Sequence, residues 1–443
     1  MKDALAKSLP FLKTSAVLLG GRLLGAALTF GYTVILARIA EPAAFGLVMS
    51  GFAAAVLLST LISLNFEAGS IRFLVLYRKE KDVSRELGFL RLSWITVTAT
   101  TGVLFVLGVF GWAVGVIDLS ETNAQVGALA LAAAPWIAVT RLYARHGTAI
   151  GHVLRGGLPI NLFQPGVVFL LLALVWASGY AVGSVGLMQQ FLVAIVVTAG
   201  LQFLLLNKAL RAPVEAGGSV KANFDAWKIW FKTAGYMAPL HVMRDNLKHV
   251  AVLSAGLTVS SEGVAPLAIA LSFMALFLFA VKAVDLAMSP RISRALQAQD
   301  YTEATSLLAS AALAKAAICV VGFVALVLVG DVVIRIFGEA YGSAFVPLLV
   351  LTAIPASEAI WGPAQLVLNV SGRQKVVARL AMVSGAIVVA AIAVGGFWGG
   401  ATGASAGLAL GYCLQQALLR RMSRREVGIE TSILSAFSPR PAN

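Results

Sequence analysis

The chain has 443 residues, of which 59% are hydrophobic and only 12% are charged, and its formal net charge is +14. A hydrophobic share this large excludes an ordinary soluble globular protein and indicates an all-α, polytopic membrane protein. Cys319 and Cys413 both lie in apolar runs, which argues against a disulfide framework and a cysteine metal site. We expect no metal and no cofactor.

Long apolar runs predict about twelve transmembrane helices, because a spanning helix needs about 20 mostly apolar residues and lipid tolerates no unpaired backbone. The first run is too long for a signal-peptide core, so we expect it to be retained. In chain order the expected spans are 13–38, 44–66, 88–115, 124–144, 157–178, 186–208, 233–257, 263–287, 305–329, 345–370, 375–397 and 401–420.

The longest hydrophilic connection separates these spans into two sets of six, which predicts two helical bundles. The expected parts are an N-terminal six-helix bundle at 1–210, a cytoplasmic linker and interfacial segment at 211–232, a C-terminal six-helix bundle at 233–425 and a cytoplasmic tail at 426–443. Trp227, Trp230, Phe231 and Lys232 suit an interface with the membrane surface.

Lysine and arginine alternate between the loops, with one set of loops rich in them, as in the segment from Arg72 to Arg85, and the other set nearly devoid of them. This bias predicts that both termini lie in the cytoplasm. We expect the membrane to be the bacterial inner membrane. The positive charge then follows from topology and indicates contact with anionic membrane lipids. We expect no nucleic-acid partner.

One expected span carries the polar stretch "APLHVMRDNLKHVAVLSAGL", residues 238–257. Its charged and histidine side chains recur every three or four residues, which places them on one side of a helix. Arg244 lies about 16 Å into the span, and a charge at that depth costs at least about 2.5 kcal/mol unless it faces protein or a wet cavity. We predict that Arg244 and Lys248 bind substrate. The alternative is an ion pair with Asp245 or another carboxylate that only fixes packing.

The first span carries a second intramembrane cation, Arg22, beside Gly20, Gly21 and Gly25. Small neighbours allow helices to approach closely. We predict that Arg22 also binds substrate and converges with Arg244 on one central cavity. The alternative is that Arg22 snorkels to the membrane surface from a tilted helix.

Four acidic residues lie at or inside the membrane boundaries and are candidates for ion coupling or charge balance: Glu67, Asp245, Asp285 and Glu358. Lys282 is three residues from Asp285, so the two are expected to pair. Snorkelling explains the position of Lys315 as well as any other role does, and Lys315 is left out of the site.

Glu358 lies between Pro355 and Pro363 in "IPASEAIWGP". Prolines interrupt the helical hydrogen bonds and free carbonyl groups, which favours proton or sodium binding beside the carboxylate. The alternative is that the prolines only kink the helix and Glu358 balances a cation such as Arg244.

Catalytic patterns are missing from the sequence: it contains no Walker motif, no H-E-x-x-H and no serine nucleophile elbow. Membrane enzymes that act on lipid-linked sugars usually need sizeable outer loops with catalytic carboxylates, and the expected outer loops are short. We expect no catalytic residues and no enzyme. The segment "GGFWGGATG", 395–403, indicates a tight turn between two helices.

Residues 21–74, "GRLLGAALTFGYTVILARIAEPAAFGLVMSGFAAAVLLSTLISLNFEAGSIRFL", resemble the start of polysaccharide and oligosaccharide-lipid flippases of the multidrug/oligosaccharidyl-lipid/polysaccharide exporter superfamily. The resemblance rests on Leu36-Ala37-Arg38, the Glu41-Pro42 turn, Phe45-Gly46, and Glu67 followed by Arg72. Members usually have Gly-Pro-acid where this chain has Ala40-Glu41-Pro42, and Leu-Gly where it has Leu64-Asn65.

This resemblance implies a V-shaped exporter that flips a lipid-linked oligosaccharide, a polyprenyl-pyrophosphate sugar, from the inner to the outer leaflet by alternating access. It also implies a first-helix arginine, matched here by Arg22. Partners expected on this basis are the lipid-linked oligosaccharide, a polysaccharide polymerase and chain-length proteins. Two alternatives stay open: a cation-coupled multidrug exporter of the same superfamily, and a non-transporting scaffold of a polysaccharide assembly machine.

Overall fold

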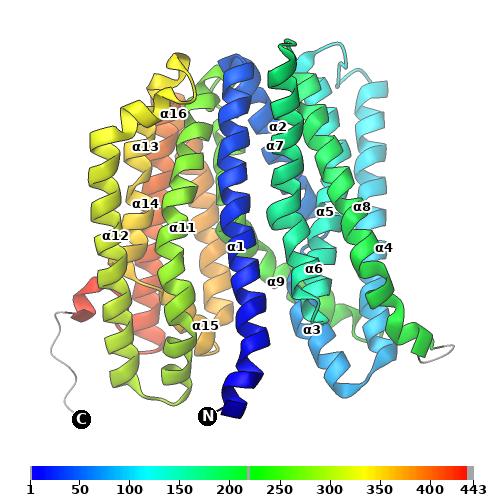
Figure 1. Ribbon diagram of the computed structural model, residues 1–443, viewed down its shortest axis with the longest axis vertical. Coiled ribbons are helices and arrows are strands. Elements are labelled where there is room, and N and C mark those ends of the chain that lie inside the picture. Colours follow the sequence, from blue (N-terminus) through cyan, green and yellow to red (C-terminus); the bar gives the residue numbers. More distant parts are fainter. Residues whose placement is uncertain (1, 217–219, 437–443) are drawn as a thin grey trace. The chain divides into compact units, whose positions relative to one another are not determined.

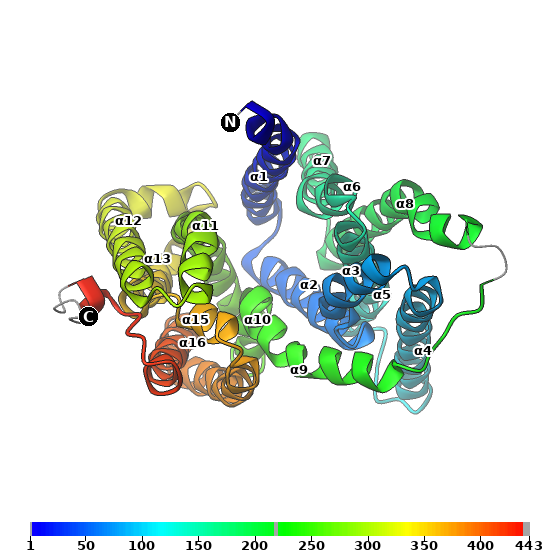
Figure 2. The ribbon, with the colours of Figure 1, turned by 90° about the horizontal axis from the view of Figure 1, so that it is seen from below.

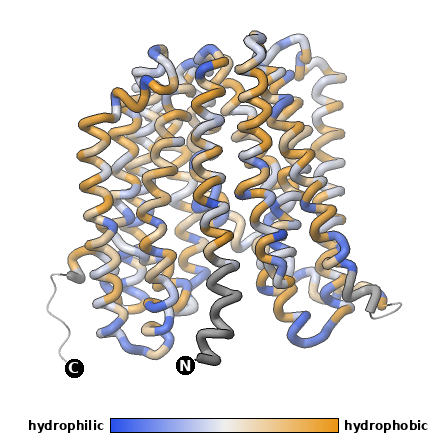
Figure 3. Tube along the Cα trace, in the orientation of Figure 1, coloured by the Kyte–Doolittle hydropathy of each residue, from blue (hydrophilic) through white to orange (hydrophobic). Residues whose placement is uncertain are grey.

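The computed structural model describes residues 2–216 and 220–436. Contacts divide the chain into two compact units, Met1–His249 and Val250–Asn443. Every regular element in the described ranges is a helix, as Figure 1 shows, so the all-α prediction is confirmed. Ten helices in these ranges are long and apolar enough to cross a membrane, and Figure 3 shows hydrophobic residues over much of their length. The chain is a multi-span membrane protein.

The first unit is formed by long helices joined by short turns, with one π-helical turn. In chain order its elements are α1 (Lys2–Ile39), α2 (Pro42–Ile62), α3 (Phe66–Glu80), α4 (Val83–Ala113), α5 (Thr122–Ala149), α6 (Val153–Leu158), η1 (Pro159–Phe163), α7 (Gln164–Ser178), α8 (Ser184–Ala216) and α9 (Trp227–Asp245). The following helix, α10 (Leu247–Ala255), runs across the boundary between the units.

Helix α5 is the centre of the first unit and packs against α2, α3, α6 and α8, as the view from below in Figure 2 shows. Its buried face carries small residues, including Ala130, Ala133, Ala134 and Ala138, each at most 1% exposed. Small side chains let helix backbones approach, which is how membrane helices gain packing energy without a hydrophobic driving force. The polar side chains described below project from this central helix and its neighbours.

The second unit begins after α10 and consists of long helices and several short ones. Its elements are α11 (Ser261–Gln297), α12 (Tyr301–Arg335), η2 (Glu339–Ala344), α13 (Phe345–Leu351), α14 (Ala353–Trp361), α15 (Ala364–Val370), α16 (Gln374–Glu426) and η3 (Ile433–Ala436). The Ser260 and Asp300 side chains cap α11 and α12 by accepting hydrogen bonds from the backbone N–H groups of Gly263 and Glu303.

The glycine-rich segment 395–403 forms the tight turn that its composition predicted. Gly399 and Gly400 leave helical geometry inside α16, and Gly400 has φ +56°. On either side of them the backbones nearly touch, because a Cβ built on Gly395 would lie 2.1 Å from the Gly403 carbonyl oxygen. The predicted spans 375–397 and 401–420 are therefore the two arms of a helical hairpin.

All twelve predicted spans are helical, yet only ten candidate spans are found in the described ranges, for two local reasons. The two arms just described are joined in α16. The predicted span 233–257 is divided at Asn246 into α9 and α10, neither of which is long and apolar enough by itself. The prediction of one continuous helix over 233–257 was therefore wrong. The prediction of one continuous helix over 345–370 was wrong as well, because the chain is divided there into α13, α14 and α15.

The division into units also differs from the predicted boundary at 211–232. Helix α9 packs against α3, so the chain stays with the first unit as far as His249. The Trp230 side chain is 1% exposed and its indole N–H donates to the Tyr77 hydroxyl at 2.8 Å. Trp230 is therefore a core residue of the first unit, whereas Trp227, 47% exposed, and Lys232, also exposed, keep the exposure expected at an interface.

The segment before α9 is fastened to α4. The Arg85 guanidinium forms hydrogen bonds to both carboxylate oxygens of Asp225, and this contact lowers the pKa of that carboxyl below its usual value. The backbone N–H of Asn223 donates to the Ser84 carbonyl at 2.9 Å. Part of the predicted linker is thus ordered against the first unit.

The predicted tail at 426–443 lies partly outside the described residues, which end at 436. Its described part packs against the second unit, and Thr431 and Ser432 are buried. The Thr431 hydroxyl donates to the Trp361 carbonyl at 2.8 Å, and Arg420 binds Glu430 through two hydrogen bonds of 2.7 and 2.9 Å. This part of the tail is therefore a docked segment.

Candidate functional site

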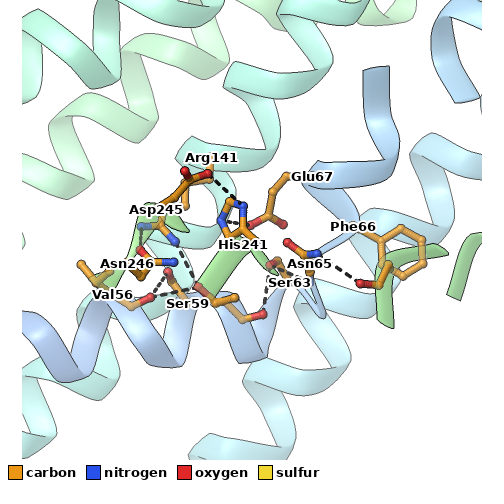
Figure 4. A network of polar contacts seen from close by, with 12 residues as sticks. Val56, Ser59, Ser63, Asn65, Phe66, Glu67, Arg141, His241, Asp245 and Asn246 are labelled. Carbon is orange, nitrogen blue, oxygen red and sulfur yellow. Dashed lines mark hydrogen bonds and ion pairs between the residues drawn. The ribbon is translucent and has the colours of Figure 1, made fainter. Parts of the chain in front are cut away.

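A cluster of charged and amide side chains lies inside the first unit, where α2, α3 and α5 meet α9 and α10. Figure 4 shows its centre, in which side chains from four of these elements point toward one another. We call it the polar cluster; it consists of Glu67, Arg141, Arg145, His241, Arg244, Asp245, Asn246 and Lys248.

The break between α9 and α10 provides the geometry of the polar cluster. Asn246 has φ −119° and ψ 14°, which ends α9, and its side chain is turned into the unit, 1% exposed. Arg141 of α5 donates to the Asn246 amide oxygen at 2.9 Å and to the Thr60 hydroxyl of α2 at 3.1 Å. One guanidinium therefore connects α5, α2 and the chain break, in an interior where such charge-assisted bonds are strong.

A line of titratable groups leads from the interior of the unit to its surface. Glu67 opens α3 and is 1% exposed, and neither of its carboxylate oxygens accepts a hydrogen bond from the described residues. His241 Nε2 lies 3.9 Å from Glu67 Oε1, and His241 Nδ1 lies 3.3 Å from Asp245 Oδ2. Burying a carboxylate without donors is costly, so Glu67 depends on the positive charge of Arg141 nearby.

Arg244 is the exposed member of the cluster, with 52% of its side chain accessible. Its guanidinium donates from Nε to Asp245 Oδ1 at 2.7 Å and from Nη2 to Asp245 Oδ2 at 2.9 Å. This forked contact matches the alternative in which Arg244 pairs with Asp245. It also shows that the guanidinium presents the edge that binds two oxygens of one anion.

The stripe predicted along one helix is divided by the break at Asn246. His241, Arg244 and Asp245 lie on α9, whereas Lys248 and His249 lie on α10. The His249 ring packs edge-on against Phe52 of α2, with 5.6 Å between centroids. Lys248 and Arg141 both act electrostatically on His249, so Lys248 belongs to the same charged region as Arg141.

Arg22 lies apart from this cluster, on α1, with an exposed side chain. Its neighbour Gly25 marks a close helix contact, because a Cβ there would lie 1.6 Å from the carbonyl oxygen of Asn161 in η1. The prediction that small residues beside Arg22 allow close packing is thus confirmed at Gly25, and the role of Arg22 stays a prediction.

Two predicted acids belong to the second unit and have partners there. Asp285 forms an ion pair with Lys315, whose side chain is 1% exposed. The prediction that Asp285 pairs with Lys282 and the snorkelling explanation for Lys315 were wrong, because α11 and α12 pack together and bury Lys315 between them. Glu358 is 9% exposed and accepts a hydrogen bond from the Tyr412 hydroxyl at 2.5 Å.

Arg141 and Asn246 were not predicted as site residues. Arg141 lies only three residues inside the end of the predicted span 124–144, where an arginine can snorkel, so its position gave no signal of depth. Arg145 lies just beyond this predicted span, but α5 continues to Ala149, so both arginines lie within the helix. Asn246 gave no signal, since a single amide in a polar stretch does not indicate a helix break.

Comparison with known proteins identifies the fold. No protein-family model and no curated protein matches the chain. Among solved structures, it resembles the inward-facing conformation of a multidrug resistance MATE family transporter of the MOP superfamily, with a TM-score of 0.72 and 14% identity over 92% of this chain and 98% of that one. It also resembles the lipid II flippase MurJ in an inward closed conformation, with a TM-score of 0.68 and 12% identity over 94% of this chain and 88% of that one.

A third similar structure is a MOP superfamily transporter from Pyrococcus furiosus, described by the reverse polarity of its binding pocket. Its TM-score is 0.62, at 14% identity over 94% of this chain and 95% of that one. Identities this low establish the fold alone. The chain therefore has the exporter fold that MATE transporters share with the MurJ flippase.

Proposed function

We propose that this protein is a transporter that flips a lipid-linked oligosaccharide, a polyprenyl-pyrophosphate sugar, from the inner to the outer leaflet for polysaccharide biosynthesis. It works by alternating access in a bacterial inner membrane, with both termini in the cytoplasm. It is not an enzyme. The observation that carries the proposal is the excess of positive charge in the polar cluster of the first unit.

The polar cluster contains more cations than acids. Arginine and lysine contribute four positive charges, from Arg141, Arg145, Arg244 and Lys248, whereas Glu67 and Asp245 contribute two negative ones. With neutral histidines an excess of two positive charges remains. Charge of one sign held inside a membrane protein is unfavourable until an anion arrives, so this excess supports binding of a pyrophosphate.

Arg244 is the proposed first contact with the pyrophosphate, because it is the exposed cation of the cluster. The edge that now binds Asp245 through Nε and Nη2 fits two phosphate oxygens equally well. Asp245 therefore competes with the substrate and keeps binding reversible, which transport requires. Lys248 is proposed to add a compact ammonium charge along the substrate's route, and Arg22 is proposed to add a second forked guanidinium there.

The same charge excess disfavours the two alternatives. A multidrug exporter that carries organic cations needs acids and aromatic rings at its site. A scaffold without transport needs equal numbers of buried cations and acids, whereas the polar cluster has four cations and two acids. Glu67, with two unbonded oxygens, is proposed to provide charge balance for Arg141 when no substrate is bound.

The proposal is tested by replacing Arg244 with Ala and with Lys in cells that depend on the protein for export of a lipid-linked oligosaccharide. We expect normal membrane abundance, loss of export and accumulation of the inner-leaflet intermediate in Arg244→Ala, and partial export in Arg244→Lys. Arg244→Ala should disturb the fold little, because the Asp245 carboxylate keeps its contact with His241 Nδ1 at 3.3 Å.

The control is Arg335→Ala, which removes an exposed arginine of the second unit that donates two hydrogen bonds to one carboxylate oxygen of Asp331. It should leave export unchanged. Normal export by Arg244→Ala would contradict the proposal. If cells with Arg244→Ala export the oligosaccharide normally but become sensitive to ethidium, the protein is a multidrug exporter instead. If the Ala variant is present in the membrane only at low abundance, the role of Arg244 is in packing.

A further inference from the structure

A groove with a volume of about 730 Å³ lies on the first unit between α4, α5 and α8, away from the polar cluster. Its walls are mostly apolar and aromatic, and they also carry two arginine side chains and one asparagine side chain. It is lined by Leu87, Leu90, Arg91, Trp94, Ile95, Tyr143, Phe203, Asn207, Leu210 and Arg211.

The groove runs along the helices from their basic ends toward the apolar interior of the membrane. On α8 it extends from Arg211 to Phe203, and on α4 from Leu87 to Ile95, which is about 12 Å on each helix at 1.5 Å per residue. Ile95 and Phe203, 55% and 43% exposed, form its apolar end. This end meets hydrocarbon in a bilayer.

An aromatic row makes the groove wall rigid. The Trp94 and Tyr143 rings meet edge to face with centroids 5.3 Å apart, and Tyr143 meets Phe203 in the same way at 6.2 Å. Such contacts hold each ring in one orientation. Tyr143 is 3% exposed, so the wall is formed by the packed core of the unit and is present before any ligand binds.

Arg211 lies at the opposite end of the groove on α8, and Arg91 lies halfway along the groove on α4. Arg91 and Arg211 are both exposed, and in the part of the chain whose side chains are described neither forms an ion pair. Arg211 acts electrostatically on the Tyr143 hydroxyl, which places its charge beside the aromatic row. Two guanidinium groups next to an amide at Asn207 match the oxygens of a phosphate diester.

We propose that this groove binds an anionic phospholipid such as phosphatidylglycerol. Arg91 and Arg211 hold the phosphate, Asn207 donates to the headgroup, and an acyl chain lies along Trp94, Ile95 and Phe203. A zwitterionic lipid is disfavoured because its own ammonium group neutralises the phosphate. Basic pockets between transmembrane helices have this chemistry generally.

The test uses purified full-length protein and native mass spectrometry with phosphatidylglycerol or phosphatidylcholine. Wild-type protein should retain phosphatidylglycerol in preference to phosphatidylcholine. The double variant Arg91→Gln/Arg211→Gln should bind phosphatidylglycerol about thirtyfold more weakly, since each of the two basic residues contributes about 1 kcal/mol toward an anionic lipid. Lys208→Gln is the matched control: it removes an exposed charge from the same helix, outside the groove, and should behave as wild type.

A second measurement separates binding from folding. Phosphatidylglycerol should raise the melting temperature of the wild type and of Lys208→Gln, and should not raise that of the double variant, while all three melt alike in phosphatidylcholine. Equal retention of the two lipids by the wild type would overturn the proposal. Undiminished phosphatidylglycerol binding by the double variant would also overturn it, as would displacement of phosphatidylglycerol by undecaprenyl phosphate at equal concentration, which would make the groove a site for the carrier lipid.

Discussion

Replacing Arg141 with Met removes the one guanidinium that connects α5, α2 and the break between α9 and α10. The methionine side chain fills much of the same volume with apolar atoms. The Asn246 amide oxygen then loses its 2.9 Å donor in a site where the residue is 1% exposed, and the Thr60 hydroxyl loses a 3.1 Å contact. Glu67 loses the positive charge of Arg141.

The expected loss of stability follows from these contacts. Hydrogen bonds to charged groups contribute about 1.5–3 kcal/mol each, and removing one partner from a buried charged network costs about 3–5 kcal/mol because the other partner stays buried. For a unit of this size, about 2–4 °C of melting temperature corresponds to 1 kcal/mol. Arg141→Met should therefore melt at least about 6 °C below the wild type.

The assay is thermal unfolding of the purified protein in detergent, followed by intrinsic tryptophan fluorescence. Arg155→Met is the control, because Arg155 is exposed near the start of α6. The double variant Arg141→Met/Glu67→Gln tests the cause: removing the stranded carboxylate should recover at least about 1 kcal/mol relative to the sum of the single variants. A melting temperature equal to the control, or strictly additive effects in the double variant, would refute this account of the cluster.

Two further variants test contacts elsewhere. Gly25→Ala should lower thermal stability by about 1–3 kcal/mol, because its Cβ would lie 1.6 Å from the Asn161 carbonyl oxygen, whereas Gly20→Ala meets nothing within 4 Å and should be neutral; equal stabilities would contradict the close contact of α1 with η1. Burial opposes the ionisation of Glu430, but hydrogen bonds from Arg420 and Ser432 outweigh it and lower its pKa from 4.5 to about 2. Docking of the segment after α16 should therefore be fully stabilised above about pH 4.5 and weaken as the pH falls toward 2. Electron paramagnetic resonance of a spin label at position 434 should report increased mobility in that range, and Glu430→Gln should be mobile at neutral pH; a mobile segment in the wild type at pH 6 would contradict the docking.

The positions of the helices could be predicted from the sequence, because a bilayer forces every apolar run of sufficient length to satisfy its backbone within a helix. The tight turn at 395–403 was equally local, since glycine alone permits the backbone contact between Gly395 and Gly403. The departure from the family pattern at Asn65 has a local reason as well. Asn65 has φ +61°, a conformation that glycine and asparagine tolerate best, and its amide donates to the Ala234 carbonyl.

The partners of the intramembrane charges could not be predicted, because they are set by which helices pack together. Lys315 is buried against Asp285 only because α11 lies against α12, and Lys282 is nearer to Asp285 in sequence. Arg141 joins the site through Thr60 and Asn246, which are 81 and 105 residues away along the chain. Hydropathy depends on each residue and its near neighbours along the chain, so the sequence determined the membrane-spanning helices. The energy of a buried charge depends on the atoms around it in space, so only the tertiary structure decided where each charge finds its partner.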